Sequence, residues 1–94
     1  MAGLPQLTLY SRQYCHLCHE MQAQLDLVRA GLPEELGFEL NVLDVDRNPE
    51  LTARFNELVP VLMHDEHELA RYRLDETAVL NLREYLRANL AQTR

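Results

Sequence analysis

The amino-acid sequence predicts an α/β fold with the element order βαβαββα, in which a four-stranded mixed sheet is flanked by helices. Two observations predict this class. Short apolar runs alternate with stretches that repeat apolar residues at helical spacing, and a Val-Pro pair separates the second helical stretch from two further short runs. With 94 residues, the chain is expected to form one domain over 1–94.

The first three elements are expected to form a βαβ unit. Residues 6–10 are short and apolar enough to be a central strand, and residues 11–14 form the loop before Cys15. The helix that follows has one apolar stripe, made of Leu17, Met21, Leu25, Val28 and Leu32. It is expected to end at Gly31, and a second strand follows over 38–45. Because a right-handed crossover joins parallel strands, these two strands are expected to be parallel.

The second helix is predicted from its start signals. Asn48 is expected to be its N-cap and Pro49 its first residue, because an Asn side chain accepts from the first turn and proline needs no donor there. The apolar stripe of this helix is Leu51, Phe55 and Leu58.

An antiparallel hairpin and a last helix complete the fold. The third strand is expected over 61–63 and the fourth over 68–72, with a polar turn at 64–67. Asp75 is expected to cap the last helix, which ends before residues 92–94. The stripe of that helix is Val79, Leu82, Leu86 and Leu90.

Charge and composition exclude several classes of protein. Fifteen acidic residues against nine basic ones give a net charge of −6, which argues against binding to nucleic acid. Every basic residue is arginine, so the chain lacks the lysine of a P-loop and of Schiff-base catalysis. No targeting segment and no membrane-spanning apolar run is recognised. We therefore expect a soluble cytoplasmic protein without a membrane partner.

The chemistry is expected where the first strand gives way to the first helix, because both cysteines of the chain lie there. In a reducing compartment such a pair is catalytic or metal-binding rather than structural. Cys15 and Cys18 are nearly one helical turn apart, so their sulfurs can close a disulfide or share a metal. Cys15 lies in the first turn, where unpaired N–H groups and the helix dipole favour a thiolate. We expect Cys15 to be an exposed nucleophile and Cys18 a more protected resolving cysteine.

A Cys-x-x-Cys after the first strand, the βαβαββα order and a Val-Pro before the third strand make the chain resemble a glutaredoxin of the thioredoxin-fold superfamily. It is similar to short bacterial glutaredoxin-like proteins that share Tyr-Ser-Arg/Lys-x-x-Cys-x-Leu-Cys, over Leu7 to Leu90. The resemblance implies a thioredoxin/glutaredoxin-like fold and a thiol–disulfide oxidoreductase in which Cys15 attacks and Cys18 resolves. The implied partners are protein or small-molecule disulfides, with glutathione as a candidate co-substrate. No resident cofactor or metal and a monomeric chain are expected.

Three residues around the nucleophile are expected to act on it. By the resemblance, Arg12 matches the basic residue three positions before the nucleophile and can attract a thiolate or a substrate carboxylate, a merely solvated arginine being the alternative. Tyr14 is expected to shield the sulfur from one side. His16 can stabilise the thiolate when protonated or donate to it when neutral, unless it is simply exposed.

The Val-Pro pair is expected to help bind the substrate. By the resemblance, Pro60 matches the proline that is cis in the family, an isomer that proline tolerates far better than other residues. The N–H and C=O of Val59 should then lie beside Cys15 and pair with the backbone of a bound cysteine.

The sequence departs from the glutaredoxin pattern at the positions that would bind glutathione. The family usually has Pro-Tyr between the cysteines, where this chain has His16-Leu17, and Leu58 replaces a threonine before Val-Pro. Ala70-Arg71 replaces a Gly-Gly pair, so the close backbone approach that glycine allows is lost. Asp75 alone remains as an acidic partner for glutathione. We therefore expect weak recognition of glutathione.

Metal binding and a non-catalytic interaction role are the alternatives. Cys15, Cys18, His64 and His67 are suitable zinc ligands if the third strand brings the histidines close to the cysteines. Two chains could instead share an iron–sulfur cluster. Residues 15–19 also match the Cys-x-x-Cys-His signature of haem attachment, which requires an exported protein. The last alternative is a thioredoxin-fold module that binds a partner without redox turnover.

Overall fold

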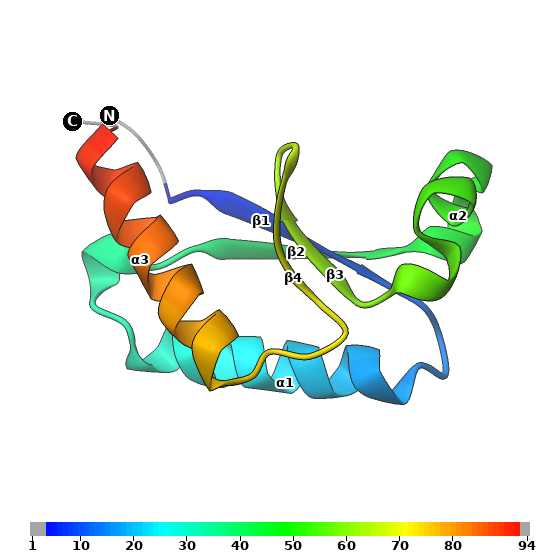
Figure 1. The fold of residues 1–94 in the computed structure, drawn as a ribbon, viewed down its shortest axis with the longest axis horizontal. Coiled ribbons are helices and arrows are strands. Elements are labelled where there is room, and N and C mark those ends of the chain that lie inside the picture. The colour runs from blue at the N-terminus through cyan, green and yellow to red at the C-terminus, as the bar shows by residue number, and fades with distance from the viewer. Residues whose placement is uncertain (1–3, 93–94) are drawn as a thin grey trace.

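A computed structural model describes residues 4–92, with side chains described through residue 89. The elements follow the predicted βαβαββα order (Figure 1). They are β1 (Gln6–Ser11), α1 (His16–Gly31), β2 (Glu39–Asp44), α2 (Pro49–Phe55), β3 (Val61–His64), β4 (His67–Arg71) and α3 (Glu76–Gln92), with short 3-10 turns η1 (Glu34–Leu36), η2 (Val45–Arg47) and η3 (Asn56–Leu58). Leu90, predicted to extend the stripe of the last helix, has a side chain outside the described part.

The four strands form one mixed sheet in the order β2-β1-β3-β4. β1 pairs in parallel with β2, from Gln6 opposite Glu39 to Ser11 opposite Asp44, and β3 and β4 form an antiparallel hairpin. The predicted fold class and both predicted pairings are confirmed. β3 runs antiparallel to β1, with Tyr10 opposite Val61. The end of β1 that leads to Cys15 therefore lies beside the beginning of β3.

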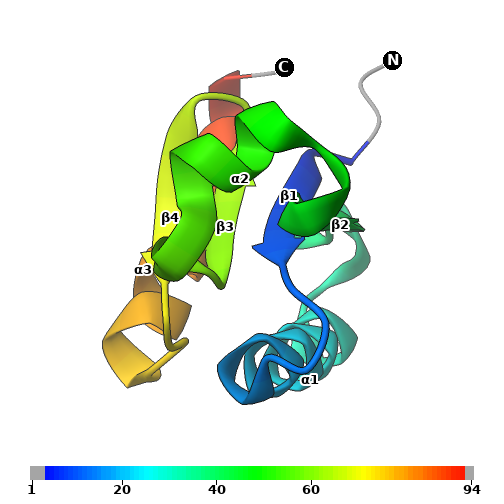
Figure 2. The ribbon, with the colours of Figure 1, turned by 90° about the vertical axis from the view of Figure 1, so that its right-hand side faces the viewer.

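Helices cover both faces of the sheet, and each face has its own apolar core. Figure 2 shows α1 and α3 on one side of the sheet and α2 on the other. Because side chains alternate along a strand, Leu9 packs into the cluster that contains α1 and α3, whereas Tyr10 packs against the cluster that contains α2. The Tyr10 ring stacks on Phe55 with ring centroids 4.2 Å apart. β1 is thus held from both faces and along both edges.

Several predicted boundaries were wrong by a few residues. The second strand covers 39–44 rather than 38–45, although Phe38 and Val45 are both buried at its ends. The second helix was expected to include Leu58 in its apolar stripe, but α2 ends at Phe55. Asn56 (φ 11°, ψ −97°) leaves the helical region and begins the 3-10 turn η3. The fourth strand stops at Arg71 because Tyr72 has a positive φ of 67°. The last helix extends to Gln92.

Within the described residues, no helix combines the length and the apolar character that crossing a lipid bilayer requires.

Candidate active site

Cys15 and Cys18 are joined by a disulfide at the start of α1, with Cα atoms 5.2 Å apart. Cys15 is the N-cap residue, with extended backbone (φ −100°, ψ 105°), rather than a residue of the first turn as predicted. Its Sγ accepts a hydrogen bond of 3.2 Å from the backbone N–H of Cys18. This is the position in which a Ser or Asp side chain usually accepts from a helix. In the reduced protein the same N–H would stabilise a thiolate on Cys15.

The two sulfurs differ in access. Cys18 is 0% exposed and belongs to the buried face of α1, whereas Cys15 is partly exposed. The first turn of α1 contains no acidic residue, so no carboxylate there opposes a negative sulfur. A reagent or substrate can therefore reach Cys15 while Cys18 is covered.

Arg12 is held by two partners across the loop. Its Nε lies 2.9 Å from Oδ2 of Asp46, and its Nη2 donates to Oδ1 of Asn56 at 3.2 Å. The arginine predicted to attract a thiolate or a carboxylate is thus ion-paired, and its charge is largely compensated. The contact ties the loop before Cys15 to η2 and η3.

Tyr14 does not shield the sulfur. Its side chain is 98% exposed, and its backbone has a left-handed conformation with φ 59°. A residue that exposed covers almost nothing, because the turn at this position directs the ring into solvent. The expectation that Tyr14 shields the sulfur was wrong.

His16 is bound by a neighbour on its own helix. Its Nε2 lies 3.0 Å from Oε1 of Glu20, and its side chain is 87% exposed. The contact joins residues one turn apart on the surface of α1. The predicted contact between this imidazole and Cys15 is not among the interactions seen in the described part of the chain.

The Val59–Pro60 peptide bond is cis. Val59 follows η3 with an extended backbone (φ −65°, ψ 148°). The C=O of Pro60 accepts from the N–H of Tyr72 at 2.8 Å, which fixes the residue after β4 beside the Val-Pro pair. Sequence reasoning missed Tyr72, because a tyrosine in the left-handed region leaves no signal in the sequence. The left-handed backbone therefore lies at Tyr72, directly after the Ala70-Arg71 pair that replaces the Gly-Gly of glutaredoxins.

Asp75 caps α3, as predicted. Its Oδ1 accepts from the N–H of Ala78 at 2.8 Å, and its C=O accepts from Val79. One carboxylate oxygen of Asp75 therefore caps the helix. The side chain is exposed, so the carboxylate also faces solvent.

The predicted zinc ligands are not brought together. Because β3 is antiparallel to β1, Met63 pairs with Thr8, and His64 follows at the end of the sheet away from Cys15. There His64 Nδ1 forms a hydrogen bond with the Tyr85 hydroxyl. The His67 ring stacks on the Tyr85 ring, with ring centroids 4.9 Å apart. No group of three or more His, Cys, Asp or Glu suited to a metal ion occurs among the residues described.

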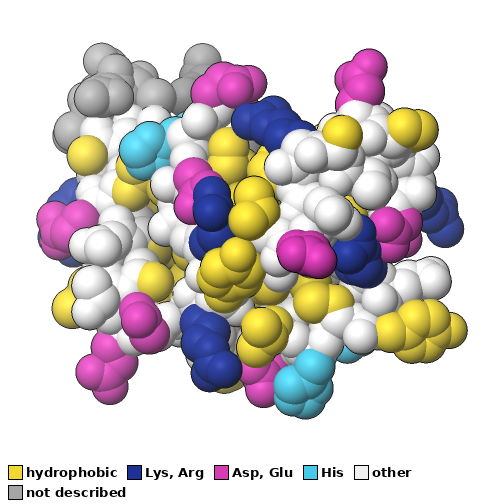
Figure 3. Space-filling model, turned by 45° about the vertical axis from the view of Figure 1, so that its right-hand side comes forward, with side chains coloured by type: hydrophobic (Ala, Val, Ile, Leu, Met, Phe, Trp, Pro, Cys, Tyr) yellow, Lys and Arg dark blue, Asp and Glu magenta, His cyan; other side chains and the backbone are white. Residues whose placement is uncertain are grey.

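The molecular surface on the side of β3, β4 and α2 combines all side-chain types. Figure 3 shows hydrophobic side chains gathered near the middle of this view, with arginines and acidic residues interspersed among them. Several arginines here have acidic partners, including Arg71 with Glu68 at 2.7 Å and Arg54 with Glu66 at 3.5 Å. This face therefore has no large area of one charge sign.

Comparison with known proteins gives a consistent result. The family described as glutaredoxin-like domain (DUF836) matches residues 6–85. An uncharacterised protein of Mycobacterium tuberculosis is 36% identical over 77 residues, which cover 77% of this chain and 75% of that protein.

Two solved structures are also similar. A protein of Nitrosomonas europaea, solved by solution NMR, is 36% identical with a TM-score of 0.67, covering 84% of this chain and 91% of the other. Thioredoxin 1 of Thermosipho africanus is 18% identical with a TM-score of 0.59, covering 89% and 97%. The latter similarity concerns the fold alone.

Proposed function

The chain belongs to the glutaredoxin-like domain family (DUF836), and from this premise we propose that it is a thiol–disulfide oxidoreductase that acts through Cys15 and Cys18. One observation carries the proposal. The two sulfurs form a disulfide at a helix start where one is accessible, the other is buried, and a backbone N–H points at the accessible one. These are the conditions that make one cysteine a nucleophile and the other a resolving group.

The reaction consists of two exchanges. In the reduced enzyme, the Cys15 thiolate attacks one sulfur of a substrate disulfide; that S–S bond breaks, and the first substrate thiolate leaves and takes up a proton. Cys18 then loses its proton to solvent and attacks Cys15 Sγ. The mixed disulfide breaks, and the second substrate sulfur leaves as a thiolate that takes up a proton from solvent. Two electrons pass to the substrate, and an external thiol or dithiol reductant restores the Cys15–Cys18 pair.

Binding of the substrate backbone is assigned to Val59. Val59 precedes Pro60 just before the beginning of β3, and that beginning lies beside the end of β1 that leads to Cys15. A substrate segment that presents a cysteine there gains a short β-bridge from the backbone N–H and C=O of Val59. The substrate class is therefore a disulfide within an extended peptide or a small peptide-like molecule.

Glutathione is a weak substrate in this proposal. The Arg12 guanidinium that would meet its glycyl carboxylate is paired with Asp46 and bonded to Asn56. At the other end of the ligand Asp75 remains, but one of its oxygens caps α3. Each missing charge-assisted contact costs about 1.5–3 kcal/mol, or roughly ten- to a hundredfold in affinity.

The test is a redox titration of the purified protein with free thiols counted. We expect two thiols to be lost together in a dithiol redox buffer, and both Cys15→Ser and Cys18→Ser to abolish the paired transition. Turnover should be fast in an assay coupled to a dithiol reductant and slow in one coupled to glutathione.

The control separates this proposal from a monothiol mechanism. If Cys18→Ser retains full turnover with glutathione at the rate of an ordinary glutaredoxin, the resolving role of Cys18 and the weak recognition of glutathione are both wrong. If neither assay shows turnover although the disulfide forms, the chain is a non-catalytic thioredoxin-fold module.

A further inference from the structure

Arg12 connects the two segments that border the candidate active site. It lies three residues before Cys15, in the loop between β1 and α1, and its Nη2 donates to Oδ1 of Asn56 at 3.2 Å. Asn56 begins η3 and lies three residues before Val59. One side chain therefore bridges the loop that presents the nucleophile and the segment that presents the proposed substrate-binding backbone.

The hydrogen bond between Arg12 and Asn56 extends the contact between these segments beyond the sheet. The last residue pair between β1 and β3 is Tyr10 opposite Val61, and the Tyr10 ring stacks on Phe55, the residue before Asn56. Figure 1 shows that the chain leaves β1 and enters β3 at the same end of the sheet. The stacked rings fix the two segments there, and Arg12 continues the contact toward the site.

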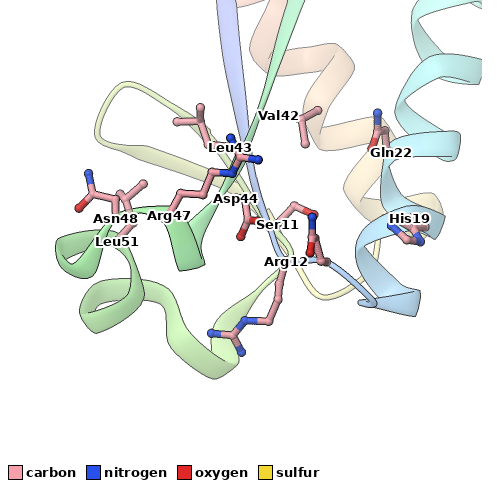
Figure 4. A pocket seen from close by; sticks show the side chains of 11 residues that line it. Ser11, Arg12, His19, Gln22, Val42, Leu43, Asp44, Arg47, Asn48 and Leu51 are labelled. Atoms are coloured by element: carbon pink, nitrogen blue, oxygen red, sulfur yellow. The ribbon is translucent and has the colours of Figure 1, made fainter.

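A second partner holds the guanidinium group of Arg12 in place. Its Nε lies 2.9 Å from Oδ2 of Asp46, and the N–H of Asp46 donates to Oδ1 of Asp44 at the end of β2. Figure 4, which looks into a pocket beside this loop, shows the Arg12 side chain extending toward the green ribbon of α2 and η3. Because Nε and Nη2 belong to one rigid planar group, two acceptors fix both its direction and its rotation.

This arrangement favours a positional role for Arg12 over an electrostatic one. The ion pair with Asp46 compensates the charge that could otherwise attract a thiolate. Disulfide exchange, in contrast, depends closely on geometry, and a misplacement of about 1 Å between reacting groups can cost about a hundredfold in rate. A bridge between the two segments therefore has a direct use in the reaction.

We propose that Arg12 is a positioning residue that sets the spacing between Cys15 and Val59. A peptide held by the Val59 backbone then presents its sulfur in line with Sγ of Cys15. This inference rests on the proposed disulfide exchange and on the assignment of substrate binding to Val59. It adds a residue that acts on the substrate only through the relative placement of two others.

The test compares two disulfides that have the same leaving group. One is a short peptide whose cysteine is joined to thionitrobenzoate, and the other is mercaptoethanol joined to thionitrobenzoate, which has no peptide backbone. In the reduced protein the Cys15 thiolate attacks the peptide or mercaptoethanol sulfur, the S–S bond breaks, and thionitrobenzoate leaves as a coloured thiolate. The ratio of the two second-order rate constants measures the advantage that the Val59 backbone provides.

Two variants remove the bridge in different ways. Arg12→Lys keeps the positive charge but loses the planar fork, whereas Asn56→Ala keeps the arginine and removes its acceptor. We expect the parent protein to favour the peptide about tenfold and each variant to reduce this preference to about twofold. The rate constant with the mercaptoethanol disulfide should stay the same. Because both substitutions break one contact, the double variant should lose no more than either single variant.

Two further variants should retain the full preference for the peptide. Asn56→Asp keeps a side-chain oxygen that accepts from Arg12, so it should restore what Asn56→Ala loses. Arg87→Lys is the matched control, because Arg87 is another exposed arginine with an acidic partner, Glu84, and it lies on α3.

Three results would overturn the positioning role. They are full peptide preference in Arg12→Lys or Asn56→Ala, a parallel fall of both rate constants in these variants, and an equal loss of preference in Arg87→Lys. A parent protein that reacts with both disulfides but does not favour the peptide would show that the Val59 assignment is wrong, and the role of Arg12 with it. Exchange through Cys15 and Cys18 is measured separately by the redox titration, so these results leave that proposal unaffected.

Discussion

Arg12 and Asp46 form an ion pair between residues 34 positions apart, with Nε and Oδ2 separated by 2.9 Å. The side chains are 29% and 49% exposed, so the pair contributes at most about 1 kcal/mol to stability. Its greater effect is electrostatic, because it compensates the one positive charge in the loop before Cys15.

Removing that compensation should improve recognition of a substrate carboxylate. In Asp46→Asn the guanidinium is no longer neutralised, and we expect the KM for glutathione to fall about fivefold while the free energy of unfolding changes little. Asp26→Asn is the matched control, since it breaks the Asp26–Arg29 pair on α1 with the same change in net charge. An equal fall in KM for both variants would show that only the net charge matters.

Asp75 allows the capping role and the charge to be separated. Asp75→Asn keeps a side chain that caps helices well, whereas Asp75→Ala removes the bond to the Ala78 N–H. We expect Asp75→Ala to lower the free energy of unfolding by about 1 kcal/mol and Asp75→Asn to leave it unchanged. In both variants kcat/KM for glutathione should fall about three- to tenfold. Undiminished kcat/KM in Asp75→Asn would mean that Asp75 is a cap and no more.

Tyr85 should make the protein sensitive to alkaline pH. Burial, together with the negative charge of Asp65, raises the pKa of Tyr85 above its ordinary value of about 10. The unfolded chain therefore ionises first as the pH rises. The stability associated with the protonated hydroxyl is complete below the unfolded pKa and is lost as the pH passes through the folded one.

The measurement is urea unfolding between pH 8 and 11 by far-UV circular dichroism. Tyr85→Phe should be less stable at neutral pH by about 1 kcal/mol, because the bond to His64 is lost, and should show a shallower alkaline decline. The chain contains no lysine, so no side-chain ammonium group titrates in this range. Tyr14→Phe, at a residue 98% exposed, is the control and should decline like the parent. Equal slopes in all three proteins would disprove the prediction.

The two cysteines should react at different rates after reduction. Cys15 is accessible and accepts the Cys18 N–H, whereas Cys18 is completely buried. With a limiting amount of iodoacetamide, peptide mapping should find Cys15 labelled at least about ten times more than Cys18. Preferential labelling of Cys18 would reverse the assigned roles.

The fold was predictable because its signals are local. The apolar stripe of α1, the Asn48-Pro49 start of α2 and the Asp75 cap each lie within a few residues of the structure they specify. Helix propensity and capping act at that range, so the pattern is visible in one sequence.

Parts of the site could not be predicted, because they depend on contacts between distant segments. The pairing of Arg12 with Asp46 joins two loops, and the placement of His64 depends on β3 running antiparallel to β1. The left-handed backbone at Tyr72 arises at a residue that has no preference for it. Only the assembled sheet determines these three relationships.

β1 is bonded to β2 along one edge and to β3 along the other, and both of its faces are covered. Its amide protons should be among the slowest in the protein to exchange with deuterium, although Cys15 follows only a short loop later. Reduction and oxidation should change exchange in that loop and in the first turns of α1 while β1 stays protected. The sulfur of Cys15 then lies a short loop beyond the end of a strand whose amides exchange slowly. The protein can be oxidised and reduced while the hydrogen bonds of β1 stay closed.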